Sequence, residues 1–153
     1  MAAPTRPWNI NIHYDELLAA LAPRGSRVLD VGCGDGFLAA RLADQGCHVT
    51  AVDIDAPVLE RARHRWAGYP VDWVQADVLS HAFEARSFDV VLSNATLHHL
   101  PDEVQALHTL GELVSPGGRL GVVGFARSGP RDWPMTAVLY RPGSDGGSHH
   151  TEG

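Results

Sequence analysis

Apolar residues follow two periodicities that alternate along the chain. Short runs of alternating or continuous apolar residues predict strands at 27–31, 47–53, 71–76, 88–93 and 119–125. Before the first strand and between most of the others, apolar residues at helical spacing predict helices at 15–22, 37–45, 57–66 and 102–114. Such alternation indicates βαβ units, so we expect an α/β domain with a mostly parallel sheet and helices on both of its faces, three layers in all.

This topology predicts where a ligand would lie. Right-handed crossovers place the loops that follow parallel strands at one edge of the sheet, and ligands of open α/β sheets bind outside these carboxyl ends. The positions of interest are therefore those directly after Val31, Asp53, Ala76 and Ser93.

The densest motif, VLDVGCGDG at 28–36, joins the first predicted strand directly to a helix. Gly32 and Gly34 allow a tight turn and a close approach of the backbone to a ligand. Phe37 stands where a dinucleotide-binding fingerprint has glycine or alanine, which disfavours a nicotinamide cofactor. Asp30 and Asp35 flank the turn and would repel a pyrophosphate, so they favour a ligand with an ammonium group. A plain tight turn without a ligand is the alternative.

Two further carboxylates follow the next strands. Asp53, in AVDID, can accept hydrogen bonds from both hydroxyls of a ribose. Its alternative role is a helix N-cap, for which Asp55 is the stronger candidate. Asp77, in QADV, can accept from an adenine amino group while the N–H of Val78 meets a ring nitrogen. The alternative for Asp77 is an Asx turn within the loop.

Composition narrows the function classes. The 153 residues carry a net charge of −6, and all twelve basic residues are arginine. The acidic balance disfavours nucleic acid as the main partner, and the lack of lysine excludes Schiff-base chemistry on a lysine and a P-loop. No membrane span, signal peptide, zinc-ligand spacing or disulfide framework is recognised. We therefore expect a cytoplasmic enzyme or binding domain with no metal and no membrane partner.

Five segments taken together resemble one family. The segments VLDVGCGDG, AVDID, QADV, FDVVLSNATLHHL and LVSPGGRLGVVGF, in this order and spacing, resemble the class I S-adenosylmethionine-dependent methyltransferases. The LHHL segment is similar to that of members that act on small molecules. The resemblance covers residues 15–125 and implies a Rossmann-like, doubly wound fold, S-adenosylmethionine as cofactor, and methyl transfer to a small-molecule acceptor.

The resemblance also implies roles for individual residues. Asp30 orients the ammonium group of the cofactor, and the glycine loop with Gly32, Cys33 and Gly34 lies beneath its methionine part. Cys33 is expected to fit the turn by its size and not to act as a nucleophile. The segment 11–14 folds over the cofactor in related members.

The implied adenosine contacts continue along the sheet edge. Asp53 holds the ribose hydroxyls, and Ile54 packs on adenine. Asp77 and Val78 contact the polar edge of the base.

The end of the fourth predicted strand supplies the reaction side. The resemblance places Ser93 and Asn94 beside the methionine part and the methyl sulfonium, and His98 or His99 along the path to the acceptor. An imidazole pKa of about 6.5 suits proton removal at neutral pH, if the acceptor arrives protonated. Because the two histidines are neighbours, we expect only one to face the site; the other starts a helix or packs.

The end of the chain departs from the family pattern, which continues after the fifth strand with a helix and an antiparallel hairpin. Residues 126–153 are rich in proline and glycine, and only 135–140 suggests a short strand or helical turn. We therefore predict a cofactor-binding domain at 1–126 and a tail at 127–153 that is the truncated end of the same domain, with the hairpin missing or incomplete. An uncovered fifth strand would be an aggregation-prone edge of the sheet, so a homo-oligomer through the exposed edge is expected.

Two other functions stay open. A nicotinamide-dependent oxidoreductase shares the fold and Asp53, although Phe37 and the acidic turn disfavour it. A cofactor-binding domain without turnover is the non-enzymatic alternative, and the short C-terminal region favours it.

Overall fold

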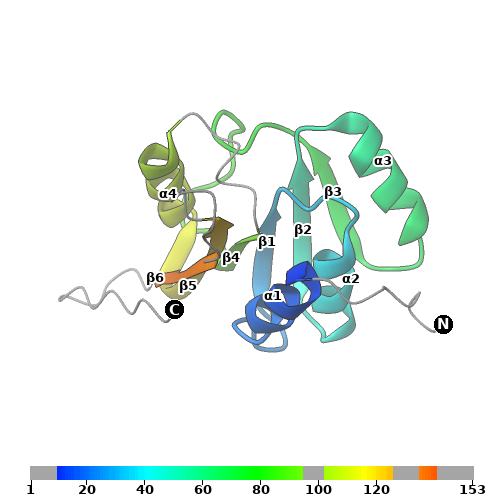
Figure 1. Ribbon diagram of the computed structural model, residues 1–153, viewed down its shortest axis with the longest axis horizontal. Helices are drawn as coiled ribbons and strands as arrows, with labels where there is room; N and C mark the ends of the chain where they lie inside the picture. Colours follow the sequence, from blue (N-terminus) through cyan, green and yellow to red (C-terminus); the bar gives the residue numbers. More distant parts are fainter. Residues whose placement is uncertain (1–9, 95–101, 126–134, 141–153) are drawn as a thin grey trace.

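The part of the chain that the computed structural model describes, residues 10–94, 102–125 and 135–140, forms a six-stranded sheet (Figure 1). The strands are β1 (Arg27–Val31), β2 (His48–Asp53), β3 (Val71–Gln75), β4 (Phe88–Asn94), β5 (Val114–Phe125) and β6 (Met135–Tyr140). They lie in the order β3-β2-β1-β4-β5-β6; β1 to β5 pair in parallel, and β6 runs antiparallel to β5. The chain changes direction across the sheet between β1 and β4, so the switch point lies there.

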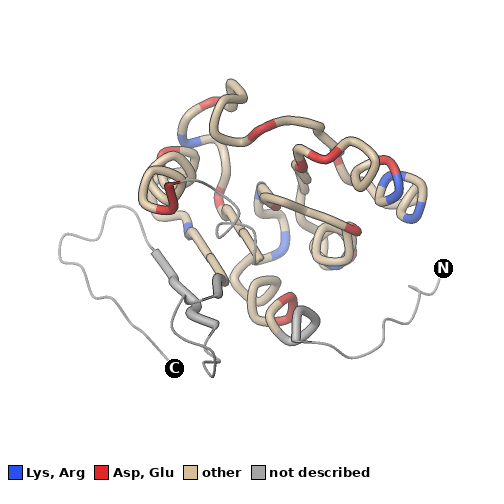
Figure 2. The backbone as a smooth tube through the Cα atoms, turned by 45° about the horizontal axis from the view of Figure 1, so that its top comes forward, with Lys and Arg blue, Asp and Glu red and all other residues tan. Residues whose placement is uncertain are grey.

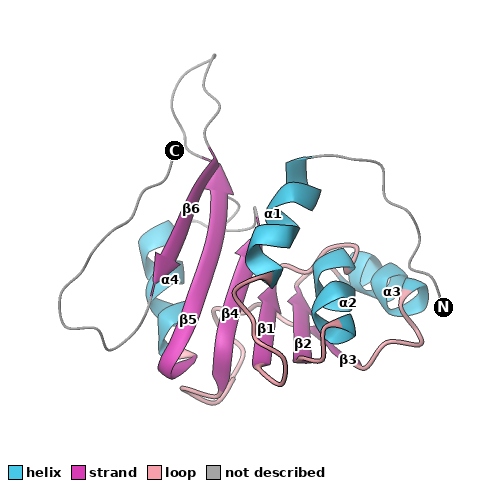
Figure 3. Cartoon of the chain, turned by 90° about the horizontal axis from the view of Figure 1, so that it is seen from below, coloured by secondary structure: helices cyan, strands magenta, loops and turns pink. Residues whose placement is uncertain are grey.

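Helices cover both faces of the sheet and confirm the predicted three-layer α/β fold (Figure 3). The helices are α1 (Ile10–Ala19), α2 (Phe37–Asp44), α3 (Ala56–Arg65) and α4 (Glu103–Glu112). α1, α2 and α3 pack on one face, and α4 packs on the other together with the loop that joins β3 to β4. In the described chain, no helix has the length and apolar character needed to cross a bilayer.

The central strands are buried on both faces, which explains why their sequences read as continuous apolar runs. Val28 and Leu92 point toward α1 and α2, whereas Leu29 and Val91 point toward α4, and all four are completely buried. Removing each such side chain from water contributes roughly 1.5–3 kcal/mol to folding. This packing fixes the carboxyl ends of β1 and β4, where the candidate site lies.

The first helix begins earlier and ends earlier than the predicted range 15–22. α1 spans Ile10–Ala19, so Asp15 lies in its interior and does not start it. The backbone then tightens, because the amide groups of Leu21 and Ala22 donate to carbonyls three residues back. Pro23 follows, and the residue before a proline disfavours helical backbone.

The predicted helix over 102–114 ends too late, and the segment Pro116-Gly117-Gly118 that follows it lies inside a strand. α4 ends at Glu112, and β5 begins at Val114, which pairs with Phe88. The Pro-Gly-Gly segment is a bulge inside this strand, after which regular pairing resumes at Arg119 opposite Val90. A bulge bends its strand and raises the local twist.

The outer side of β5 is paired with a further strand. Met135–Tyr140 forms β6, which pairs with β5 from Leu120 to Phe125. The outer strand on this side of the described sheet is therefore β6, and a homo-oligomer through the sheet edge stays a prediction. The strand itself was one of the two forms that the sequence pattern favoured for 135–140.

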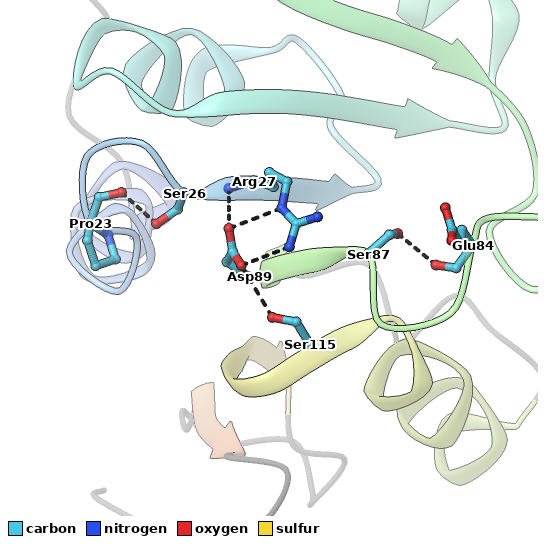
Figure 4. A network of polar contacts seen from close by, with 7 residues as sticks. All are labelled: Pro23, Ser26, Arg27, Glu84, Ser87, Asp89 and Ser115. Carbon is cyan, nitrogen blue, oxygen red and sulfur yellow. Dashed lines mark hydrogen bonds and ion pairs between the residues drawn. The ribbon is translucent and has the colours of Figure 1, made fainter.

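A polar contact network joins three strands at their amino ends (Figure 4). Asp89 Oδ2 accepts from the backbone N–H of Arg27 at 2.8 Å, and its Oδ1 pairs with the Arg27 guanidinium at 3.2 Å. Ser115 Oγ donates to the same carboxylate at 3.3 Å. The Arg27 guanidinium and N–H lower the pKa of Asp89. The network lies at the edge of the sheet opposite the candidate site.

Candidate functional site

The glycine-rich turn closes over the carboxyl end of β2. The N–H groups of Gly32 and Cys33 donate to the carbonyl of Val52 at 2.8 and 3.0 Å. Gly34 and Gly36 have φ angles of +52° and +82°, which other residues rarely adopt. A methyl group on Gly34 would meet no atom within 4 Å, whereas one on Gly36 would lie 2.7 Å from the Trp73 ring. Gly34 thus faces open space, and Gly36 serves packing.

Trp66, the residue that ends α3, supports this turn, a role that the sequence analysis missed. Its indole Nε1 donates to the carbonyl of Asp35 at 2.8 Å, and the residue is 2% exposed. Its ring packs edge-on against Phe37 and Tyr69, with centroids 5.2 and 5.1 Å apart. A buried indole N–H requires an acceptor, so this bond fixes the end of the turn to the helix. Only the spatial approach of α3 to α2 reveals it.

Asp53 joins the end of β2 to the glycine turn. Its Oδ2 accepts from Gly34 N at 3.0 Å, and its Oδ1 accepts from Asp55 N at 2.9 Å. Each carboxylate oxygen retains a second acceptor position. Asp55 caps α3 by accepting from Val58 N at 3.1 Å, so the alternative of Asp53 as the cap is wrong. Ile54 lies between them with 66% of its surface exposed.

Asp77 adopts the alternative that the sequence left open for it. Its Oδ1 accepts from Leu79 N at 3.0 Å, an Asx turn in the loop after β3. The carboxylate is exposed, and the side chain of Val78 is buried beneath it against the α4 face. The backbone hydrogen bond from Ala76 N to the Asp53 carbonyl holds the start of this loop at the same edge of the sheet as Asp53.

Asp30 is a buried carboxylate near the end of β1, only 2% exposed. Its Oδ2 has no hydrogen-bond partner among the described residues. Burial, and then the nearby charges of Asp15 and Asp53, raise the pKa of Asp30 to about 8. A buried carboxylate oxygen without a donor is costly, and native proteins rarely retain one unless a ligand or ion completes it.

Asp15 brings a second buried carboxylate to the same place. Asn94, the last residue of β4, donates from Nδ2 to Asp15 Oδ1 at 2.7 Å. Asp15 is 8% exposed, although the sequence analysis took it only as a helix start. The signal was available: Asp15 shares the i, i+3, i+4, i+7 face of Leu18, Ala19 and Ala22, all of which are buried.

The end of β4, where the sequence places the methyl group and the acceptor, is described up to Asn94. Ser93 is completely buried, and its Oγ has no partner among the residues described. It pairs in register with Val31, so it lies at the end of the sheet beside the glycine turn. The predicted catalytic residues His98 and His99 lie outside the described residues.

Cys33 sits in the turn as a buried thiol. Burial, followed by the charges of Asp30 and Asp53, raises its pKa far above the ordinary value. A nucleophilic cysteine needs a depressed pKa, so this thiol is inert and fills space. That its size selects Cys33 for the turn stays a prediction.

A separate hollow of about 610 Å³ lies at the opposite edge of the sheet. Its lining comes from the amino ends of the strands and includes Arg27, His48, Val71 and Phe88. Ligands of parallel α/β sheets bind at the carboxyl ends. The buried, unpartnered Asp30 oxygen is at that carboxyl edge, so the chemistry favours it over the hollow.

Comparison with known proteins gives a consistent family. A family model described as "Methyltransferase domain" matches residues 28–118. An uncharacterized methyltransferase of Mycobacterium tuberculosis (strain ATCC 25618 / H37Rv) is 54% identical over 135 residues, covering 86% of this chain and 68% of the relative. A ubiquinone biosynthesis O-methyltransferase of Klebsiella pneumoniae is 40% identical over 117 residues; the match covers 74% of this chain and 48% of that protein.

Solved structures have the same fold. The crystal structure of an S-adenosylmethionine dependent methyltransferase from Mesorhizobium loti superposes with a TM-score of 0.65 at 27% sequence identity. The match covers 72% of this chain and 52% of that chain. The chain therefore spans about half the length of this structure and of the Klebsiella relative.

Proposed function

Because the chain belongs to the methyltransferase domain family, as a class I S-adenosylmethionine-dependent methyltransferase, we propose that it binds its cofactor at the carboxyl edge of β1, β2 and β4 and methylates a small molecule. One observation carries the proposal. The buried Asp30 carboxylate has an oxygen without a partner among the described residues, and it lies at the end of the strand that leads into the glycine turn. An ammonium group is the complement that such an oxygen requires.

The residues present fit S-adenosylmethionine. Asp30 would accept from the ammonium group, and the open space over Gly34 leaves room for the methionine part. Asp53 would accept from the ribose hydroxyls with the positions that its two backbone bonds leave unused. The exposed Ile54 offers an apolar surface to adenine.

The other proposed cofactor contacts flank this group. Asp77 and the N–H of Val78 would meet the edge of adenine from the loop after β3. Ser93 and Asn94 would border the methionine part at the end of β4. The hydroxyl of Ser93 is buried and its Oγ has no partner in the described chain, which supports its assignment to a ligand.

Methyl transfer from a sulfonium requires the protein mainly to bind and orient the two reactants. S-adenosylmethionine, when bound, supplies a methyl group that its sulfonium has already activated. The chain must hold the acceptor in line and exclude water, an orientation effect worth up to about 7–11 kcal/mol. The buried ends of β1 and β4 exclude water from one side of the site. His98 or His99 would remove a proton from an acceptor that arrives protonated.

Relatives support a small-molecule acceptor with a hydroxyl group. The Klebsiella relative is named as an O-methyltransferase of ubiquinone biosynthesis, and its match includes about half of its length. We therefore propose an oxygen nucleophile on a small organic molecule as the first acceptor class to test. The non-catalytic alternative predicts cofactor binding without transfer to any acceptor.

Calorimetry with three ligands tests the proposed function. We expect S-adenosylmethionine and S-adenosylhomocysteine to bind and NADH not to bind. Transfer of a labelled methyl group to a panel of phenols and other hydroxylated small molecules then tests turnover. Binding of NADH in place of both sulfur nucleosides would favour the oxidoreductase alternative, and binding without any transfer would favour the non-catalytic one.

Replacing Asp53 separates cofactor contact from helix capping. We expect Asp53→Ala to weaken S-adenosylhomocysteine binding by about 1–3 kcal/mol, because charge-assisted hydrogen bonds are lost. Asp55→Ala is the matched control two residues away. It should lower stability by about 1 kcal/mol through the lost N-cap and leave affinity within about twofold. Unchanged affinity of Asp53→Ala in calorimetry would remove the ribose assignment.

The neighbouring histidines should differ in their effect on turnover. If one imidazole removes the acceptor proton, its replacement by alanine lowers kcat by about 100-fold or more, while replacement of the other changes kcat little. Both variants should retain cofactor affinity. Measuring kcat for His98→Ala and His99→Ala on the same acceptor checks this, and equal, mild losses would eliminate a histidine base.

A further inference from the structure

Two acidic neighbours on α1 have different surroundings. Glu16 is exposed and pairs with the exposed Arg41 at 3.6 Å. Asp15 points the other way, into the carboxyl edge of the sheet, where it is 8% exposed and accepts from Asn94 Nδ2 at 2.7 Å. Glu16 therefore interacts at the surface, whereas the Asp15 carboxylate lies beside the candidate site.

The neighbourhood of Asp15 is rich in negative charge. Asp30 on β1 lies close enough for the two carboxylates to repel each other, and Asp53 on β2 adds to the repulsion. None of the ion pairs among the described residues involves Asp30. The arginines of α3 lie at the outer side of the fold (Figure 2). The described chain therefore places two buried carboxylates together without a cation on Asp30.

We propose that Asp15 is a second carboxylate of the ammonium-binding site, so that α1 and β1 hold the amino-acid end of the cofactor between Asp15 and Asp30. This inference rests on the proposed function. It extends the site to a residue outside the five motifs. It also accounts for the Asp15–Asn94 hydrogen bond. That bond fixes α1 to the end of β4, which positions the Asp15 carboxylate at the edge.

An organic cation suits this pair better than a metal ion. In the ranges that the structure describes, no three His, Cys, Asp or Glu side chains come close enough together to hold a metal. The unpartnered Asp30 Oδ2 needs a hydrogen-bond donor, and an ammonium group supplies three. A ligand with both a cationic group and N–H donors complements the negative charge of this neighbourhood and supplies the donor that Asp30 Oδ2 requires.

The experiment compares two ligands that differ in the amino-acid end. S-adenosylhomocysteine carries the ammonium group, and 5′-methylthioadenosine has the same adenosine and thioether without it. Asp15→Asn removes the charge but keeps an oxygen that accepts from Asn94. Glu16→Gln is the matched control on the exposed face. Asp15→Ser is a second variant with a hydroxyl acceptor, and thermal unfolding identifies which variants fold.

We expect Asp15→Asn to weaken S-adenosylhomocysteine by about tenfold to 100-fold and to change 5′-methylthioadenosine by less than about twofold. Glu16→Gln should change neither ligand. Unchanged S-adenosylhomocysteine affinity in the folded variants overturns the inference, as do equal losses for both ligands, which indicate a packing role. If the wild-type protein binds neither ligand, the proposed function fails first, and that result is distinct from a failure of Asp15 alone.

Discussion

Asp30→Asn should weaken S-adenosylhomocysteine binding by about 30-fold or more, since removing one partner of a buried charge pair costs roughly 2–5 kcal/mol. The same substitution should make the protein without cofactor more stable at alkaline pH. Both effects follow from one feature, a carboxylate buried at the carboxyl edge with an oxygen that no described residue satisfies.

The pH dependence of stability follows from the pKa of this group. Burial, with Asp15 and Asp53 nearby, raises the pKa of Asp30 from 3.8 to about 8 in the folded protein. The folded state then holds a proton that the unfolded state releases between these values. The contribution of Asp30 to stability is therefore fully present below about pH 4 and decreases as pH rises to about 8, by up to about 1.4 kcal/mol per pH unit.

An asparagine at this position cannot ionise, so the stability of Asp30→Asn relative to wild type should increase as pH rises from about 4 to about 8. Thermal unfolding at several pH values measures this difference. Asp89→Asn is the control: the Arg27 contacts lower the pKa of Asp89, so its stabilisation is lost only on acidification below about pH 4, and over the range measured for Asp30 the difference between Asp89→Asn and wild type should stay nearly constant. A pH-independent difference for Asp30→Asn, together with unchanged affinity, would contradict the assignment.

Methyl groups on two neighbouring glycines should separate binding from folding. Gly34→Ala places a methyl group in open space and strains a φ of +52°, so it costs about 1–2 kcal/mol of stability. Because that space is where we place the methionine part, affinity for S-adenosylhomocysteine should fall by about tenfold or more, the equivalent of about 1.4 kcal/mol.

Gly36→Ala should have the reverse profile. Its methyl group would lie 2.7 Å from the Trp73 ring and 2.9 Å from the Trp66 ring, and its φ is +82°. Strain and overpacking together cost about 2–5 kcal/mol. Chemical denaturation measures the stability of both variants, and calorimetry measures the affinity of each folded variant for S-adenosylhomocysteine. A larger loss of stability in Gly34→Ala than in Gly36→Ala would contradict this division between the two glycines.

The sequence predicted the parallel part of the fold because its signals are local. Each buried strand is a short apolar run, and α3 and α4 begin at an aspartate cap, Asp55 and Asp102. What the sequence missed depends on pairing between distant segments. The bulge at 116–118 and the position of β6 are set by contacts with β4 and β5 that no local pattern contains.

The candidate site divides in the same way. Asp53, Asp55 and the glycine turn could be located by their spacing, and the structure brings them into direct hydrogen bonds. Asp15 and Trp66 could not, because each approaches the site from another helix after the chain has folded. Asp15 did carry a signal, a charge on the buried face of an amphipathic helix, which becomes meaningful once that face is known to meet the carboxyl edge.

A crystal structure with S-adenosylhomocysteine tests the central claim most directly. We predict the amino group of the nucleoside beside Asp30, its ribose on Asp53, and its methionine part over Gly34. Density for the nucleoside elsewhere, or an empty carboxyl edge at saturating concentration, would contradict the assignment of this edge as the cofactor site.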